Sequence, residues 1–566
     1  MRRKILALSV VMAVILAGYA AYLFKTHHQD EASTAQNIED GEGGIGHKRF
    51  ISQDYSEIIN MAKWRYNQED DVYYQLGILY AQRPADEKYE RLALFVPSAF
   101  MNCRANGPET YSCEPNEDGR IGKYGVKTAP IVIPVESPEY AANPALTEYK
   151  NFSLYTKAGM VYAHVGFRGL EHGAPAGLVD LKAAIRYIRH NQPQIPAQTD
   201  RIFVFGTGRG GGLGALLGTT ADSAMFRPYI KDIGAPEYAS DKVYGVMAWC
   251  PITDFDAADE AYEWNMGMTR AGLSPKQQEL SQRMAQEYVR YVNNAGFRDE
   301  HGQPLILQYS KHGVYQEGSY YDYVKSVIEK SLNEFLQTST YPLQIAEDEV
   351  PPHLKRFSGY FSDKEKYLRR LNEDLNWVRY DGVAGSYTIR SIEDFVRIFK
   401  PATKPIGAFD SLARTQTENI LFGLGNNQGY HFDKYMVKIL KDGALSAEYA
   451  SDLKKHDALG YSVQDRLNMY TPLYFTMPMY EGYRTAKVAP FWRIRSGISQ
   501  TETSLTTEIN LALALINYPM VEKVDFKTIW AKGHSRAEEK NRDSEQAFIK
   551  WIDEVTEVVY KFSTDN

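Results

Sequence analysis

The stretch that decides the fold reads Arg201-Ile202-Phe203-Val204-Phe205-Gly206-Thr207-Gly208-Arg209-Gly210-Gly211. A β-rich apolar run enters a glycine-rich turn, and the apolar run Leu213–Leu217 that follows is typical of a helix. Sharp strand-to-helix turns of this kind build two sorts of site: dinucleotide-binding loops and nucleophile elbows.

The dinucleotide interpretation rests on the spacing G-x-G-x-x-G, which Gly206, Gly208 and Gly211 supply. That site also needs an acidic residue at the end of a second strand, roughly 20 residues further on, to hold the ribose. The residues there, Ala224–Ile230, do not resemble a strand. The next convincing strand, Val243–Trp249, is followed by Cys250 rather than an acid. The sequence therefore disfavours a nucleotide site and predicts no cofactor.

The elbow interpretation needs small residues two positions on either side of a nucleophile. Gly206 and Gly210 fill the small positions, which leaves Gly208 in the centre. Moving the frame to make Thr207 the nucleophile would put Arg209 where a small residue is required. Because glycine adopts a left-handed conformation freely, Gly208 keeps the turn but provides no attacking group.

Outward from this turn, β-rich runs alternate with helical patterns. Between two of the early strands, Gly177–Asn191 has apolar residues at helical spacing. This alternation predicts a mostly parallel sheet covered by helices on both faces. The predicted strands are Leu92–Val96, Ile131–Val135, Met160–Val165, Arg201–Phe205, Val243–Trp249, Val488–Ile494 and Val524–Trp530.

The alternation of strands and helices ends at about residue 256, where long helical patterns rich in Tyr, Lys, Glu and Gln begin, such as Lys276–Asn294. We interpret residues 256–400 as a lid or cap inserted between two parts of the sheet domain, residues 48–255 and 401–566. A polar, glycine-rich linker, residues 26–47, precedes them.

The N-terminus predicts export. Arg2, Arg3 and Lys4 precede an uncharged, mostly apolar run, Ile5–Phe24, that is long enough to cross a bilayer. Residues 1–25 are therefore a retained membrane anchor or a cleaved signal peptide, and the body lies outside the cytoplasmic membrane, either anchored there or free in the periplasm or medium.

Cysteine usage agrees with export. Cys103 and Cys113 lie in a loop-rich stretch and are candidates for a disulfide, whereas Cys250 ends an apolar run and is expected to be a buried thiol.

Composition limits the partners. The formal net charge is −7 and no basic stripe stands out, which argues against a nucleic-acid partner. The chain has 41 tyrosines, a residue suited to sites that hold sugars or phenols.

Several ordered segments resemble the bacterial subtype B tannases and related phenolic-acid esterases. The resemblance implies an α/β-hydrolase fold with a large lid and a Ser-Asp-His triad that cleaves galloyl or similar aromatic esters. The segments are Gly166–Gly169, Gly173–Ala184, the elbow, Cys250–Asp254, Ala261–Asn265, Ala408–Asp410, Glu418–Gly423 and Gly533–Glu538.

Carried over residue by residue, the triad of that family is degenerate here. Gly208 stands at the serine position, Gln500 stands at the acid position, and His534 is retained. An amide does not stabilise an imidazolium as a carboxylate does. Glu502 is an alternative acid, but it supplies no nucleophile.

The resemblance also implies a ligand site. The family's groups that hold phenolic hydroxyls match Lys404, Glu418 and Glu502, the last with one methylene more than the family's aspartate. The backbone N–H of Arg209 corresponds to one oxyanion donor. The loop Glu136–Glu139 replaces the usual oxyanion glycines, with Pro138 lacking a donor.

Two functions follow as expectations. The first is a pseudoenzyme on a tannase-like scaffold that binds a phenolic ester without a metal or cofactor. The second is a working carboxylic ester hydrolase whose nucleophile lies elsewhere.

Overall fold

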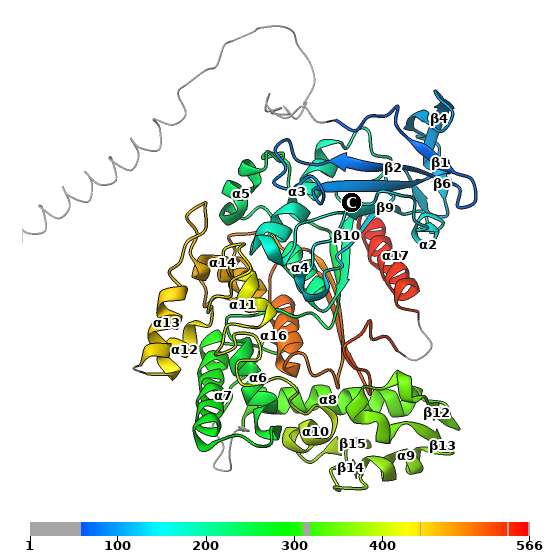
Figure 1. Ribbon diagram of the computed structural model, residues 1–566. Helices are drawn as coiled ribbons and strands as arrows, with labels where there is room; N and C mark the ends of the chain where they lie inside the picture. The colour runs from blue at the N-terminus through cyan, green and yellow to red at the C-terminus, as the bar shows by residue number, and fades with distance from the viewer. Residues whose placement is uncertain (1–57, 309–316, 442, 540–542, 564–566) are drawn as a thin grey trace, which may run out of the picture. The chain divides into compact units, whose positions relative to one another are not determined.

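The main sheet brings strands from both ends of the chain together (Figure 1). The structure is a computed structural model that describes residues 58–308, 317–441, 443–539 and 543–563, all within one unit, Asp54–Asn566. Among these residues the sheet has nine strands in the order β1-β2-β3-β9-β8-β10-β11-β16-β17. The bounds are β1 Arg65–Asn67, β2 Val72–Leu79, β3 Arg91–Pro97, β8 Ile131–Pro134, β9 Val161–Val165, β10 Ile202–Thr207, β11 Gly245–Trp249, β16 Phe491–Gly497 and β17 Lys523–Ile529.

The six strands from β9 to β17 run parallel, while β1, β2 and β3 add an antiparallel edge. The predicted α/β-hydrolase fold with a mostly parallel sheet is therefore confirmed. The predicted strand Val488–Ile494 is displaced: β16 begins at Phe491, directly after Pro490, which cannot donate to a ladder.

Helices cover both faces of the sheet, because alternate side chains of each strand point to opposite sides. On one face, helix α17 (Ser544–Ser563) places Phe548 with its ring 4.6 Å from that of Phe205. On the other, helix α4 (Arg209–Thr219) approaches so closely that a Cβ on Gly218 would lie 2.5 Å from Trp492. Figure 1 shows α4 and α17 on opposite sides of the strands, and α3 (Ala176–His190) beside α4.

The segment between β11 and β16 holds the insertion. Helix α7 shows why its sequence folds locally: Ser274 and Gln277 form a capping box, and Gly296 ends the helix in the left-handed region. The main sheet resumes only at Phe491, so the predicted lid, residues 256–400, is followed by further helices before the strands return. The helices and hairpins between β11 and β16 are α6 Ala258–Met266, α7 Pro275–Ala295, α8 Ser319–Thr338, α9 Lys364–Leu371, α10 Ile392–Phe399, α11 Thr417–Leu421, α12 Lys434–Ile439, α13 Ala444–Asp452, α14 Val463–Met469, α15 Pro472–Thr476 and the hairpins β12–β13 (Leu343–Ile345, Gly359–Phe361) and β14–β15 (Val378–Asp381, Ser386–Ile389).

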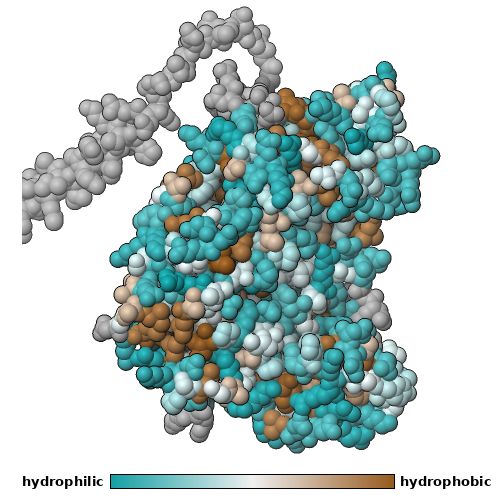
Figure 2. Space-filling view, viewed as in Figure 1, coloured by the Kyte–Doolittle hydropathy of each residue, from teal (hydrophilic) through white to brown (hydrophobic). Residues whose placement is uncertain are grey.

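A small hydrophobic cluster separate from the main core lies within this insertion. Met284 of α7 packs there with Met436 and Ile439 of α12. In Figure 2 hydrophobic side chains gather at the surface where Figure 1 places α12, α13 and the adjoining part of α7. The insertion therefore has packing of its own.

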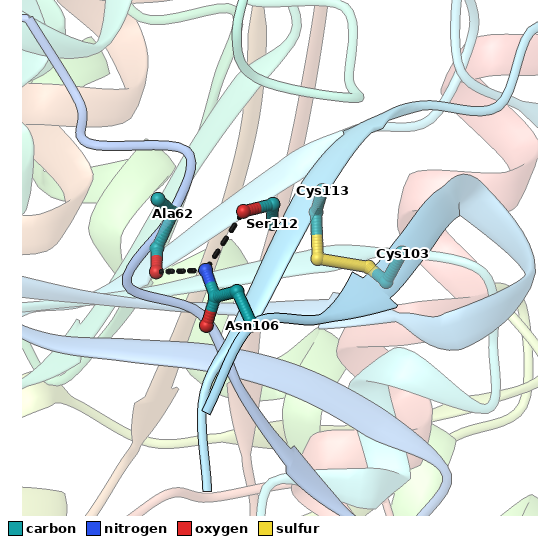
Figure 3. The surroundings of a disulfide bond; sticks show 5 residues. All are labelled: Ala62, Cys103, Asn106, Ser112 and Cys113. Atoms are coloured by element: carbon teal, nitrogen blue, oxygen red, sulfur yellow. Dashed lines mark hydrogen bonds between the residues drawn. A yellow bond between two sulfur atoms is a disulfide. The ribbon is translucent and has the colours of Figure 1, made fainter. Parts of the chain in front are cut away.

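The predicted disulfide is present in a hairpin at the antiparallel edge (Figure 3). Cys103 of β4 (Met101–Ala105) and Cys113 of β5 (Tyr111–Pro115) are directly opposed partners and are joined through their sulfurs. Nearby, the Asn106 side chain donates to the backbone oxygen of Ala62 at 2.9 Å, which ties the hairpin to the preceding chain.

The N-terminal anchor and linker, residues 1–47, lie outside the described residues. Within the part of the chain that the structure describes, no helix has the length and apolar character that a bilayer span requires.

Two glycines of α4 test how tightly the elbow is packed. A Cβ on Gly210 would lie 2.1 Å from the backbone oxygen of Val135, which cannot move aside, so Gly210→Ala should lower the free energy of unfolding by about 1–3 kcal/mol. A Cβ on Gly214 would have only ordinary contacts, 3.9 Å or more away, and alanine favours a helix, so Gly214→Ala should be neutral or stabilising by about 0.5–1 kcal/mol. Urea unfolding of both variants beside the parent checks this, and equal midpoints would contradict it.

Candidate functional site

The turn between β10 and α4 has the geometry of a nucleophile elbow. Gly208 sits at its apex with φ 59° and ψ −120°, and its N–H donates to the Trp249 oxygen at 2.9 Å. Cβ atoms on Gly206 and Gly210 would lie 2.5 and 2.1 Å from the Val135 oxygen. Only small residues fit these two positions, so the local sequence determines the turn.

His534 faces the apex of this turn. A Cβ on residue 208 would lie 2.6 Å from Nε2 of His534 and 3.2 Å from Cε1. The imidazole therefore extends into the space that a side chain at position 208 would use. The segment that carries His534 follows β17, as the sequence predicted.

The surroundings of His534 favour the neutral form of its imidazole. Surrounding protein lowers its pKa below the ordinary value although the residue is exposed at one side, because the cation loses part of its hydration. Glu502 opposes this shift, while Arg209 and Lys404 reinforce it. A neutral imidazole can accept a proton, but glycine at position 208 has no hydroxyl to give one.

Gln500 is buried and its amide is fully engaged. Its Oε1 accepts from the N–H groups of Glu502 and Thr503 at 2.8 and 3.1 Å. Its Nε2 donates to Oε1 of Glu508 at 3.0 Å and to the hydroxyl of Thr503. The two lone pairs and two protons of the amide are thereby used within this network.

Glu508 and Lys400 complete that buried network, and the sequence did not single them out. Burial raises the pKa of Glu508, and Lys400 opposes the shift. Burial lowers the pKa of Lys400 to about 8, and its ammonium donates to the backbone oxygen of Gln500. The network contains one carboxylate, Glu508, which Gln500 solvates through its amide N–H.

The predicted ligand groups do come together around the elbow. Lys404 pairs with Glu502 at 3.2 Å, and its ammonium lies 4.3 Å from the ring centroid of Phe409. Partial burial acts to raise the pKa of Glu502, but the pair with Lys404 lowers it overall. Glu418 is fully buried, which raises its pKa against the opposing fields of Arg209 and Lys404. Charges of both signs thus lie close together beside the elbow.

The side chain of Arg209 was not part of the sequence prediction, which assigned only its backbone N–H. Its Nε donates to Oε1 of Glu418 at 3.0 Å, and Nη2 lies 2.9 Å from the same oxygen in an ion pair. Its Nη1 donates to Oε1 of Glu139 at 2.7 Å. The guanidinium lies 5.6 Å from the ring centroid of Tyr140. Arg209 therefore joins α4, α11 and the loop after β8.

That loop, Glu136–Glu139, lies where an oxyanion loop would. Ser137 is buried and its hydroxyl donates to the Ala141 oxygen at 2.9 Å, so it is not free to attack. Glu139 and Tyr140 have φ values of 50° and 55°, a region that non-glycine residues seldom adopt. Strain of this kind persists where surrounding contacts impose it, and it concentrates at functional sites.

A cleft of about 590 Å³ opens beside His534. It is lined by residues 348–353 of the insertion, residues 499–502, residues 533–535 and Thr403. Proline at 351 lies against the histidine loop, since a Cβ on Gly533 would come within 2.7 Å of its Cγ. The cleft has the size of small-molecule sites.

Cys250 is one alternative nucleophile, since its sulfur contacts the backbone oxygens of Gly533 and Ser535, which flank His534. It is buried, and the Gly497 N–H donates to its sulfur at 3.3 Å. Burial raises the pKa of this thiol to about 11, so the thiolate is scarce at neutral pH. Among the described residues, no group of His, Cys, Asp and Glu side chains is arranged to hold a metal ion.

The BD-FAE family model matches residues 123–312, a range that includes β8 to β11 and the elbow. No curated protein matches the chain by sequence.

Solved structures match over most of the chain. The native tannin acyl hydrolase from Lactobacillus plantarum is 25% identical with a TM-score of 0.64, covering 86% of this chain and 94% of its own. The Fusobacterium nucleatum tannase is 23% identical with a TM-score of 0.68, covering 89% and 100%. A tannin acyl hydrolase in complex with ethyl gallate is 24% identical with a TM-score of 0.65, covering 86% and 94%. The chain therefore has the α/β-hydrolase fold and is similar, over most of its length, to tannin acyl hydrolases.

Proposed function

We propose that this protein is a tannase-like pseudoenzyme that binds a phenolic ligand at the elbow and does not cleave esters by serine chemistry. One observation carries the proposal: the elbow is intact, its apex is Gly208, and Nε2 of His534 lies where a side chain at that position would begin. The turn and the general base remain, whereas the group that would form an acyl intermediate is missing.

The ligand class follows from the groups around the apex. Lys404, Glu418 and Glu502 supply a donor and two acceptors, and Glu418 Oε2 is buried without a hydrogen-bond partner. A phenolic hydroxyl can donate to such an oxygen and thereby relieve the cost of leaving it unpaired. Solved tannin acyl hydrolases are in complex with 3,4-dihydroxybenzoate and with ethyl gallate, which supports a ligand of this kind here.

An active carboxylic ester hydrolase is the second candidate. The retained His534 and elbow favour it, and Glu502 is the acid whose field acts on that imidazole. It requires a nucleophile other than residue 208. The buried Cys250 thiol and the engaged Ser137 hydroxyl are both poorly suited to that role.

The proposed location is outside the cytoplasmic membrane, with residues 1–25 as the anchor or signal. The disulfide between Cys103 and Cys113 supports an oxidising compartment. Detection of that disulfide in protein taken from the exporting cell, and its loss when residues 1–25 are deleted, would test the location.

The first functional prediction concerns turnover. We expect no hydrolysis of methyl gallate above background, because removal of a triad serine typically costs on the order of a million-fold in kcat. A labelled serine-directed fluorophosphonate should leave the protein unmodified in intact-mass spectra. Stoichiometric labelling at any residue would favour the active hydrolase instead.

The second prediction concerns repair of the site. Gly208→Ser must displace the imidazole, because its Cβ would lie 2.6 Å from Nε2, and His534 would still lack an acid. The single variant should therefore stay inactive, since loss of the acid costs about four orders of magnitude in kcat.

Adding Gln500→Asp would place a second carboxylate near Glu508, where like charges raise the pKa of both. Glu508→Gln added to that pair restores one carboxylate and one amide. Initial rates on methyl gallate should rank this triple variant above the double variant, and both above Gly208→Ser. If Gly208→Ser alone matches the triple variant, position 500 is not the acid position.

The third prediction concerns ligand contacts. Glu418→Gln keeps the side-chain volume but weakens an acceptor, so calorimetry should show binding of ethyl gallate weakened by about 1–3 kcal/mol. Glu448→Gln is the control, because Glu448 also pairs with an arginine, Arg414, but on an exposed part of the insertion. Equal effects of the two variants, or no binding by the parent protein, would contradict the proposed site.

A further inference from the structure

The guanidinium of Arg209 is the charged group closest in sequence to the missing nucleophile. Only 10% of its side chain is exposed, and two of its nitrogens hold one oxygen of Glu418. Glu418 is itself buried, so this part of the pair is shielded from water and fixed in orientation. Arg209 is thus a rigid cation with a third nitrogen, Nη1, directed at a different partner.

That partner, Glu139, is largely exposed to water, whereas Glu418 is buried. The Glu139 side chain is 67% exposed, so water competes with the ion pair and the pair is weak. Its backbone has φ 50° and that of Tyr140 has φ 55°, which is unfavourable for both residues. Besides Arg209, its carboxylate is held by the Thr417 hydroxyl at 2.9 Å. The exposed carboxylate of Glu139, on a strained loop, is therefore the partner of Nη1 of the buried Arg209 guanidinium.

The charges around the elbow determine which ligand group can replace Glu139 on Nη1 of Arg209. Lys404 is balanced by Glu502, and Arg209 is balanced by Glu418, with Glu139 in excess. A ligand carboxylate that takes the place of Glu139 on Nη1 leaves the charge of the site unchanged and lets Glu139 move into water. A neutral ester offers only a carbonyl oxygen, so it would replace a charge-assisted hydrogen bond with a weaker one.

A second group specifies the rest of the ligand. Oε2 of Glu418 is fully buried and has no hydrogen-bond partner, while Oε1 of the same carboxylate is held by Arg209. Such an oxygen needs a donor. A molecule with a carboxylate for Nη1 and a hydroxyl for Oε2 satisfies both atoms at once.

We propose that Arg209 makes this site a receptor for the free hydroxy-aromatic carboxylate rather than for its ester, with Glu139 as an internal competitor that the ligand displaces. This inference rests on the proposed function, since it assumes that a phenolic ligand enters the elbow. The acid, which an esterase would release as product, is here the preferred ligand. The protein thereby senses the product of ester cleavage carried out elsewhere.

The test compares 3,4-dihydroxybenzoate with its methyl ester by titration calorimetry on the full chain at neutral pH. We expect the acid to bind about tenfold more tightly, the scale of one charge-assisted hydrogen bond. Glu139→Gln should strengthen binding of the acid by a further factor of about three to ten and that of the ester by less, because the internal competitor loses its charge and only the acid forms a charge-assisted hydrogen bond in its place.

Glu136→Gln is the matched control. Glu136 lies on the same loop and pairs with Arg536, so the substitution removes the same charge without freeing Arg209. Arg209→Lys is an independent test. Lysine keeps the positive charge but lacks the planar set of N–H donors of the guanidinium, so the substitution should reduce the preference for the acid over the ester to about twofold or less.

The outcomes separate the two proposals. If the ester binds at least as tightly as the acid, the carboxylate inference fails and the phenolic site stands. Equal effects of Glu139→Gln and Glu136→Gln would also overturn the inference, since net charge alone would then explain them. If neither compound binds, the proposed function fails and this inference fails with it.

Discussion

The close approach of two backbone segments at the elbow is the constraint on which the rest of the site depends. The oxygen of Val135 lies so near Gly206 and Gly210 that neither position admits a Cβ. This contact forces the chain to reverse sharply after β10, and the apex residue must then adopt φ 59°. A serine at the apex is strained, whereas Gly208 is not. The elbow therefore survives loss of its nucleophile without loss of its shape.

Around that fixed turn, the site has become a set of paired charges. Arg209 is held by Glu418 and Glu139, and Lys404 is held by Glu502. Catalysis requires donors and charges that are aimed at the reacting atoms on which charge develops in the transition state. Binding requires groups whose charges are compensated before the ligand arrives and can be re-paired when it does. The described arrangement suits the second requirement, since each cation has a carboxylate and only one of those carboxylates is largely exposed.

The elbow could be predicted from the sequence because its geometry depends on sterics within a few residues. The positions of most parallel strands along the chain followed from apolar runs such as Val243–Trp249. The antiparallel edge was missed at β2, where a bulge between Gln75 and Ile78, with Gly77 at φ 68°, breaks the alternation of the strand. The resemblance to a family pointed to Lys404, Glu418 and Glu502. The pairing of Arg209 with Glu139 and Glu418 joins three distant parts of the chain, and no local pattern encodes such a contact.

The placement of the insertion has a consequence for how the protein is made. β11 pairs with β16 from Gly245 with Phe491 to Trp249 with Arg495, so the central sheet cannot close until the whole insertion has been synthesised. During that time β11 presents an unpaired edge, the kind of surface that recruits strands from other chains. The separate packing of α7 against α12 lets the intervening segment become compact first and brings the two strands closer. Synthesis of this chain therefore favours an order in which the insertion folds before the scaffold that carries it, and a delay at that stage would favour aggregation.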